Sequence, residues 1–385
     1  MGLTLGKRSG SSDVARKTAL LLFHGIGEQR PFETLDAFVR TFWRVLESRQ
    51  AGPGVAGRQM FRPTDGWVDS YVSLDPSGSD LPSIDFYEYY WANLMVGQIS
   101  LQDVVGWLVK VSDGASKFYA ENRAIVDRYE EVGHRAFRNG EFVDDWYVRM
   151  AGWPIRVLAW IGNPPVPFLQ GPIRALLSEA STILVNYVGD IAIYTTTDER
   201  VAYFPIRQKI LEGAVAKAKM LLANYERVIF VAHSLGSVIA YDTLNRLNVQ
   251  MNAGCLDKEL ASRIAGFITF GSPLDKVAFY FREHTPDDQY VRRQILANLY
   301  SFKGRDLDLQ ANEKVLLLPG EALLDHTLWL NFWNEHDPVS GHLDFYRDVV
   351  NVCLPTRDTM PDRAHGAYFT DQTMFERILE ALFPL

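Results

Sequence analysis

The sequence predicts an α/β protein with a mostly parallel sheet flanked by helices. Short runs such as Thr18–Phe23 and Leu328–Trp333 are almost continuously apolar, which is typical of strands buried on both faces. Between these runs lie segments with apolar residues at helical spacing, beginning with the one that starts at Leu35. Strands that alternate with helices form parallel sheets because each crossover places a helix on one face.

The composition is that of an ordinary globular protein. Of 385 residues, 47% are hydrophobic and 22% are charged, and the formal net charge of −8 argues against a nucleic-acid partner. No apolar run reaches the length of a transmembrane helix, and the first residues lack the apolar core of a signal peptide. Cys255 and Cys353 lie far apart, and we expect buried thiols in a reducing compartment. The expected localisation is therefore cytoplasmic.

The N-terminal part contains the first two predicted strands. Residues 1–16 are polar and rich in Gly and Ser, which predicts a disordered lead-in. The strand Thr18–Phe23 follows and ends in a Gly-rich turn. Apolar residues at helical spacing between 35 and 46 predict a helix that packs on the sheet. The alternating segment Ser83–Ala92 predicts another strand.

The pattern changes between residues 93 and 204. This stretch is rich in Trp and Leu, has mixed helical periodicities and shows no evident strand. Its length exceeds that of a normal loop, so we interpret it as a helical cap or lid, with ordinary core helices as the alternative. The helix Ala175–Val188 is strongly apolar. We expect the substrate to contact Trp160, Phe168, Leu177 and Ile183.

The remaining elements belong with the first strands in one core, 17–92 and 205–385. A helix over 206–225 leads into the next strand, and a second helix ends the chain. The predicted elements of this half are the strands Val228–Val231, Ala265–Pro273 and Leu328–Trp333 and the final helix Asp371–Leu382.

A strand, a corner and a helix follow one another without a break in Glu226–Ala240, and Ser234 is at the corner. A serine in this context predicts a nucleophile elbow, in which a strained backbone lifts the hydroxyl clear of the sheet. The residues two before and two after it must be small, and Ala232 and Gly236 meet this demand. A turn serine without a catalytic role is the alternative.

The sequence His-Gly-x-Gly, which includes His24, Gly25 and Gly27, follows the first predicted strand. Its glycines let the backbone turn so that an N–H points at a substrate oxygen. We expect the backbone N–H groups of Ile26 and of Leu235, the residue after the nucleophile, to form an oxyanion hole. The alternative is a Gly-rich loop without a ligand. A phosphate loop is excluded because the Gly-Lys-Ser/Thr ending is missing.

A serine nucleophile needs a base, and the base needs a carboxylate that orients it. The order serine, acid, histidine along the chain selects Asp337, which follows a strand, and His365, in a Gly-containing loop before the final helix. Asp275, after the strand that ends in Gly-Ser-Pro, is the rival acid. A capping aspartate and a surface histidine are the non-catalytic alternatives.

The other histidines fit the order less well. His326 precedes the acid, and His336 and His342 are too close to it in sequence. We expect His233, which precedes the nucleophile, to point into the structure as a packing or hydrogen-bonding residue.

These segments resemble serine hydrolases of the α/β-hydrolase superfamily, on the lipase and esterase side. The His-Gly-Ile-Gly segment resembles the oxyanion loop of bacterial lipases, and residues 233–242 are similar to the nucleophile segment of intracellular phospholipases of the DDHD type. Gly-Ser-Pro, Asn-x-x-Asp-Pro and His-Gly-Ala-Tyr-Phe also look like lipase landmarks. The resemblance covers 18–30 and 226–370 and implies an α/β-hydrolase fold. Ala232 departs from the usual Gly, and the cap, which selects the substrate in these families, is not covered.

The expected function is hydrolysis of carboxylic esters through an acyl-enzyme on Ser234, without a metal or other cofactor. The apolar insertion points to an acyl-chain or lipid substrate, and transient contact with a membrane or micelle through the cap. Acyl transfer on the same triad and a non-catalytic scaffold that binds protein or lipid stay open, as does the oligomeric state. Asp306 and Asp308 could suggest calcium, but two nearby carboxylates usually face solvent.

Overall fold

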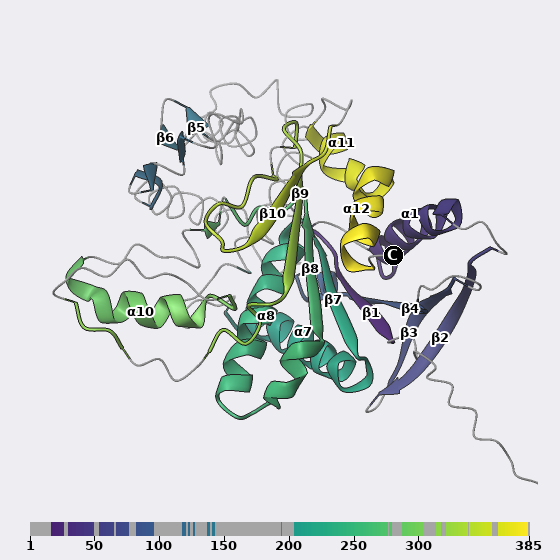
Figure 1. Cartoon of the computed structure of the whole chain (residues 1–385), viewed down its shortest axis with the longest axis horizontal. Helices are drawn as coiled ribbons and strands as arrows, with labels where there is room; N and C mark the ends of the chain where they lie inside the picture. Colours follow the sequence, from purple (N-terminus) through teal and green to yellow (C-terminus); the bar gives the residue numbers. More distant parts are fainter. Residues whose placement is uncertain are drawn as a thin grey trace, which may run out of the picture.

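A computed structural model gives the fold, and its centre is an eight-stranded sheet with strand order β10-β9-β8-β7-β1-β4-β3-β2 (Figure 1). The strands from β10 to β4 run parallel, whereas β3 and β2 pair antiparallel at one edge. The structure describes residues 17–26, 30–49, 54–64, 67–76, 82–95, 118–120, 122–123, 126–127, 137–138, 141–142, 194, 204–275, 277–278, 287–303, 313–316, 321–337, 339–355 and 361–383.

The predicted strands lie in the middle of this sheet. The eight strands of the sheet are β1 (Thr18–Phe23), β2 (Ala56–Thr64), β3 (Trp67–Asp75), β4 (Ile84–Tyr89), β7 (Arg227–His233), β8 (Ile264–Phe270), β9 (Leu328–Trp333) and β10 (Val349–Cys353). In β1, Leu20 and Leu22 pack on one side of the sheet, and Leu21 and Phe23 pack in the cluster on the other side. Both faces are therefore buried, which explains why the strand is apolar throughout.

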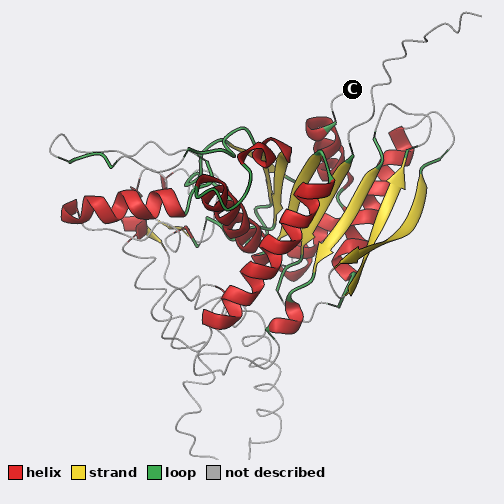
Figure 2. Ribbon diagram, turned by 90° about the horizontal axis from the view of Figure 1, so that it is seen from below, coloured by secondary structure: helices red, strands yellow, loops and turns green. Residues whose placement is uncertain are grey.

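Helices cover both faces of the sheet (Figure 2). Two long helices, α7 (Phe204–Asn224) and α8 (Leu235–Asn252), pack in one core, and α1 (Glu33–Arg49) and α12 (Gln372–Leu382) pack in the other. The shorter elements are the helices α10 (Tyr290–Leu299) and α11 (Pro361–Gly366) and the 3-10 helices η1 (Ala92–Leu94), η3 (Lys258–Arg263), η4 (Asp287–Gln289) and η5 (Ala367–Thr370). The prediction of an α/β fold with a mostly parallel, helix-flanked sheet is confirmed.

Several elements were not predicted. The hairpin β2–β3 forms an edge of the sheet, where Gly57 and Pro63 interrupt any apolar alternation in β2. Strand β10 is the other edge, and its residues are half-buried or exposed, so it lacks the apolar run of a central strand. Helix α10 also went unpredicted.

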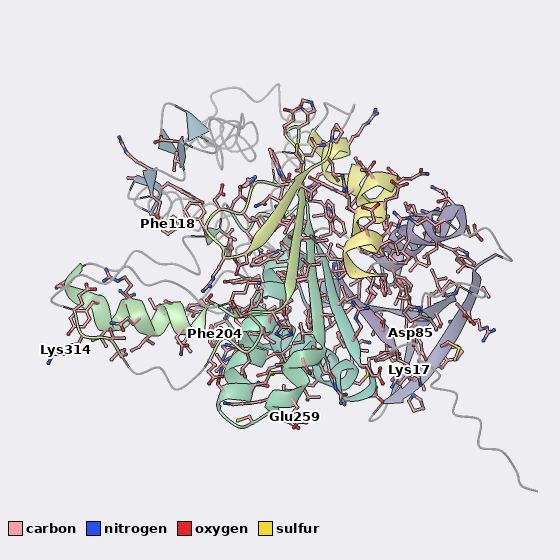
Figure 3. All side chains as sticks on the ribbon, in the orientation of Figure 1. Lys17, Asp85, Phe118, Phe204, Glu259 and Lys314 are labelled. Carbon is pink, nitrogen blue, oxygen red and sulfur yellow. The ribbon has the colours of Figure 1, made fainter. Side chains whose placement is uncertain are left out.

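The insertion between 93 and 204 is described at a few positions. Two short strands, β5 (Phe137–Arg138) and β6 (Glu141–Phe142), pair in a separate sheet, so the stretch is not free of strands. At the described positions its buried side chains join the same core as α7 and α8; these are Met95, Phe118 (labelled in Figure 3), Tyr119, Val126 and Tyr194. At these positions the side chains pack in the main core. The predicted helix Ala175–Val188 and the residues Trp160, Phe168, Leu177 and Ile183 lie outside the described residues.

Two further expectations concern the surface. Cys255 and Cys353 are free thiols, but both are exposed, so the prediction of buried thiols was wrong. Cys255 lies beyond the end of α8, and Cys353 ends an edge strand, which leaves each side chain uncovered. No helix in the part of the chain that the structure describes is long and apolar enough to cross a membrane.

Candidate active site

Ser234 lies at the turn between β7 and α8 with φ 52° and ψ −131°, a backbone conformation that non-glycine residues rarely adopt. Its N–H donates to the carbonyl of Phe270 on the neighbouring strand, at 3.1 Å. Its Oγ is buried and has no hydrogen-bond partner among the described residues. The strained corner predicted from the sequence is therefore present, and the Ser234 hydroxyl is available for chemistry.

A close approach between the elbow and the end of β1 requires Gly236. A Cβ added at Gly236 would lie 2.4 Å from the His24 carbonyl oxygen and 2.5 Å from that of Phe23. The small residue is needed because helix α8 packs against the neighbouring strand, and not only because β7 and α8 approach each other at the turn. Gly25 also lies close to the elbow, since its added Cβ would lie 2.9 Å from Cβ of Ser234. The two Gly-containing segments thus meet at the nucleophile.

The elbow carbonyl is held from the Gly-Ser-Pro segment. The Ser234 carbonyl accepts hydrogen bonds from the backbone N–H and the Oγ of Ser237, at 2.9 and 2.6 Å. Oγ of Ser237 also lies 2.7 Å from Oγ of Ser272, which follows β8. This chain of bonds connects the first turn of α8 to the end of β8 and was not predicted from the sequence.

His24 is a fully buried ring with both nitrogens in use. Its Nε2 accepts the backbone N–H of Trp91 at 3.0 Å, so Nδ1 carries the proton and donates to the Gly25 carbonyl at 2.7 Å. Burial lowers the pKa of His24 from 6.5 to about 4. His24 is therefore a neutral structural residue of the oxyanion segment.

The predicted base and acid are in contact. Nδ1 of His365 lies 3.1 Å from Oδ1 and 3.0 Å from Oδ2 of Asp337, and both residues are buried. Because a carboxylate only accepts, Nδ1 carries the proton, and the lone pair of the neutral ring is on Nε2. His365 lies in the last turn of α11 and not in a loop, as we expected from the glycine beside it.

Asp337 is held by two further hydrogen bonds. Its Oδ1 accepts the backbone N–H of Val339 at 2.9 Å, and its Oδ2 accepts the Tyr368 hydroxyl at 2.9 Å. Burial alone would raise the pKa of Asp337, but the interaction with His365 and these hydrogen bonds outweigh it and hold the pKa below its usual range. The acid is thus a carboxylate at neutral pH.

His233 connects the elbow to the base, as a packing and hydrogen-bonding residue. Its Nε2–H donates to the His365 carbonyl at 3.1 Å, and the two imidazole centroids are 4.7 Å apart. The ring also stacks on Phe270. Burial and the nearby His365 lower the pKa of His233 to about 3, so the ring is neutral and has no role as a second base.

The expected oxyanion donors lie beside the nucleophile. Leu235 is the first residue of α8, and the first N–H groups of a helix have no acceptor within the helix. Ile26 follows Gly25, which contacts Ser234. Gly27 lies outside the described residues.

The rival residues are placed elsewhere. Asp275 is fully buried, but Asp337, not Asp275, makes the hydrogen bonds to His365. His342 pairs with Asp344, with 2.9 Å between Nδ1 and Oδ2. Asp306 and Asp308 lie outside the described residues, and no group of three potential metal ligands occurs within the described part.

Sequence reasoning missed Tyr368, Trp91 and the Ser237–Ser272 pair. Tyr368 is in the predicted landmark His-Gly-Ala-Tyr-Phe and Trp91 in a predicted strand, but neither pattern indicates a hydrogen-bond partner. Only the geometry shows that they support the acid and the oxyanion segment. Comparisons with protein-family models, curated proteins and solved structures give no match.

Proposed function

We propose that the protein is a serine hydrolase of carboxylic esters with an α/β-hydrolase fold. One arrangement carries the proposal. The buried Ser234, at positive φ, has a hydroxyl without a hydrogen-bond partner among the described residues, and His365, the base that the chain order selects, contacts the selected acid Asp337. The three residues follow β7, β9 and β10, and the carboxyl ends of parallel strands meet at one edge of a sheet. The order serine, acid, histidine is that of α/β-hydrolases.

The proposed reaction uses the residues in the usual roles. Oγ of Ser234 attacks the ester carbonyl while Nε2 of His365 takes its proton, and Asp337 stabilises the resulting imidazolium. The N–H groups of Leu235 and Ile26 donate hydrogen bonds to the negative oxygen of the tetrahedral intermediate. His365 then gives its proton to the leaving alcohol. Water then attacks the acyl-enzyme while His365 takes its proton. His365 returns this proton to Oγ of Ser234 as the carboxylic acid leaves.

The absence of a hydrogen bond at Ser234 Oγ is compatible with this mechanism. Catalytic hydrogen bonds are often long or misaligned before substrate binds. The ring of His365 lies 4.7 Å, between centroids, from the ring of His233, the residue that precedes Ser234. No metal or cofactor is needed for this chemistry.

The narrower proposal is an acyl-chain or lipid substrate, as for a lipase or phospholipase, with transient membrane or micelle contact. Its support is the apolar composition of residues 93–204 and the resemblance of residues 233–242 to the DDHD type. Acyl transfer would use the same triad, and product analysis in the presence of an added alcohol distinguishes the two reactions.

Covalent labelling tests the proposal. A fluorophosphonate probe should label the wild-type protein once, and the Ser234→Ala variant should neither react nor hydrolyse p-nitrophenyl acetate. Losses near a million-fold are typical of such nucleophiles. Ser262→Ala removes an exposed serine of η3 and is the matched control, because its hydroxyl only donates to the Glu259 carbonyl. A Ser234→Ala variant that retained a tenth of the wild-type turnover, or an unlabelled wild-type protein, would contradict the proposal and favour a non-catalytic scaffold.

A further inference from the structure

The end of β4 contacts the beginning of the connection between β1 and α1. The indole Nε1–H of Trp91 donates to the His24 carbonyl at 3.2 Å, and the backbone N–H of Trp91 donates to His24 Nε2 at 3.0 Å. The two rings also stack, with centroids 4.6 Å apart and an angle of 9° between their planes. Three contacts thus hold His24 and, through its Nδ1–H, the Gly25 carbonyl.

The same end of β4 holds the other end of the connection through Glu88. Its Oε2 accepts the backbone N–H of Phe32 at 2.5 Å, and its Oε1 accepts that of Leu35, in the first turn of α1, at 3.3 Å. Glu88 is only 7% exposed, and burial raises its pKa although the two N–H groups oppose the shift. The buried carboxyl group of Glu88 therefore accepts hydrogen bonds from backbone N–H groups just before and within α1.

Phe32 shows that this end is constrained. It adopts φ 68°, a conformation that is strained for a bulky residue, and its side chain is 48% exposed. Strain of this kind persists only where the surrounding structure over-determines the backbone, and it is common near functional sites. The Phe32 N–H is held by Glu88, and the Phe32 carbonyl accepts the N–H of Asp36 at 2.9 Å.

The segment held in this way lies against Ser234. Gly25 contacts Ser234, so a shift of the Gly25–Ile26 peptide moves the Ile26 N–H relative to the reacting carbonyl. An error of about 1 Å in such a position can cost on the order of 10²-fold in rate.

We propose that Glu88 and Trp91, at the end of β4, are positioning residues that clamp both ends of the oxyanion connection. They act through His24 and Phe32 and do not touch substrate. The inference rests on the proposed ester hydrolysis and extends it by assigning the element that orients the oxyanion hole.

The first test is kinetic. Glu88→Gln keeps the size of the side chain but replaces one acceptor with an amide NH₂, which faces a backbone N–H. Trp91→Phe keeps a ring on His24 and removes the indole donor. We expect kcat with p-nitrophenyl acetate to fall about 10- to 100-fold, with KM changed less than about twofold. A displaced oxyanion donor binds the transition state more weakly but leaves binding of the substrate unchanged. The inhibition constant of a trifluoromethyl ketone, which forms a tetrahedral adduct, should rise by the same factor.

Matched variants separate positioning from stability. Asp85→Asn changes a carboxylate near the opposite end of β4 (Figure 3), where Oδ2 accepts the Tyr225 hydroxyl at 2.6 Å. Trp329→Phe removes a buried indole N–H that donates to Thr269 Oγ1 at 3.2 Å. Both controls should lower the melting temperature without changing kcat or the inhibition constant.

Hydrogen exchange gives a readout without substrate. Glu88→Gln should accelerate amide exchange in peptides that cover 24–26 and 30–35 more than in the rest of β1 and β4. Unchanged exchange there, or a kcat loss no larger than in the Asp85→Asn control, would overturn the clamp. If the wild-type protein hydrolyses no ester while exchange increases as expected, the ester-hydrolase proposal fails, and the clamp remains only as a feature of the fold.

Discussion

The imidazole of His365 donates from Nδ1 to both carboxylate oxygens of Asp337, at 3.1 and 3.0 Å, across 28 residues of chain. Asp337 follows β9 and His365 lies in α11 after β10, so the contact depends on the parallel pairing of β9 with β10. Of the two acids that the sequence named, Asp337 is thus the one that contacts His365.

The identity of the acid is the first prediction. Asp337→Asn should lower turnover by roughly 10⁴, because an amide next to Nδ1 favours the wrong tautomer of His365, while substrate binding changes little. Asp275→Asn is the matched control and should be nearly silent in turnover. Steady-state kinetics of both purified variants decide the matter. The reverse pattern would move the acid to the segment after β8.

Tyr368 should tune the acid–base pair. Its hydroxyl donates to Asp337 Oδ2, so Tyr368→Phe leaves a more basic carboxylate that stabilises the imidazolium more strongly. The acidic limb of the pH profile of kcat/KM should therefore move to higher pH. Tyr241→Phe is the control, since the equally buried Tyr241 hydroxyl donates to the Tyr300 carbonyl away from the triad. The same profile in both variants would limit Tyr368 to a structural role.

Gly236 should tolerate no side chain. In Gly236→Ala the new methyl group would overlap the carbonyl oxygens of Phe23 and His24, which are backbone atoms of a central strand and its end. We expect a loss of about 1–3 kcal/mol or more in the free energy of unfolding, measured by urea denaturation. Gly366→Ala is the control, because nothing lies within 4 Å of its added Cβ and its φ is −90°. Equal stability of the two variants would contradict the close approach.

The buried histidines predict a loss of stability in acid. The pKa of His24 falls from 6.5 to about 4 on folding, so between these pH values the unfolded chain binds more protons and the free energy of unfolding decreases as the pH falls. The shift corresponds to roughly 3 kcal/mol. The lowered pKa of His233 also decreases the free energy of unfolding as the pH falls. Burial raises the pKa of Glu88, so above the usual pKa of a glutamate this residue has the opposite effect.

Comparison with a variant isolates the contribution of His24. His24→Asn should be less stable than the wild type at pH 7, because it loses contacts to Trp91. The difference should narrow between pH 7 and pH 4.5, because the wild type alone has this histidine to protonate. Urea unfolding at both pH values measures it, and a constant difference would show that folding does not lower the pKa of His24.

The insertion gives the last prediction. If it contacts an acyl chain, Leu177→Asn and Ile183→Asn should weaken hydrolysis of long-chain esters and spare p-nitrophenyl acetate, because the triad lies elsewhere. Val126→Asn is the control, since Val126 is fully buried in the main core and its variant should lose both activities and melting temperature together. Parallel loss of both activities in the first two variants would show that Leu177 and Ile183 are ordinary core residues.

The local sequence determined the central strands and the elbow. Residues of β1 and β9 are apolar because both faces of the sheet are covered, and that requirement is visible in any single strand. The corner at Ser234 was also predicted, because small residues and a strand-to-helix switch are local signals. The hairpin β2–β3 and strand β10 went unpredicted because strands at the sheet edges bury less and need no apolar run.

The tertiary structure decided which residues of those local elements contact one another. The contact of Trp91 with His24 joins residues 67 positions apart, and Glu88 reaches Phe32 across 56 positions. Strand order and register create such pairs, and no spacing within one segment encodes them. For the same reason the sequence could propose both Asp275 and Asp337, whereas the packing of α11 against the end of β9 determined which carboxylate meets His365.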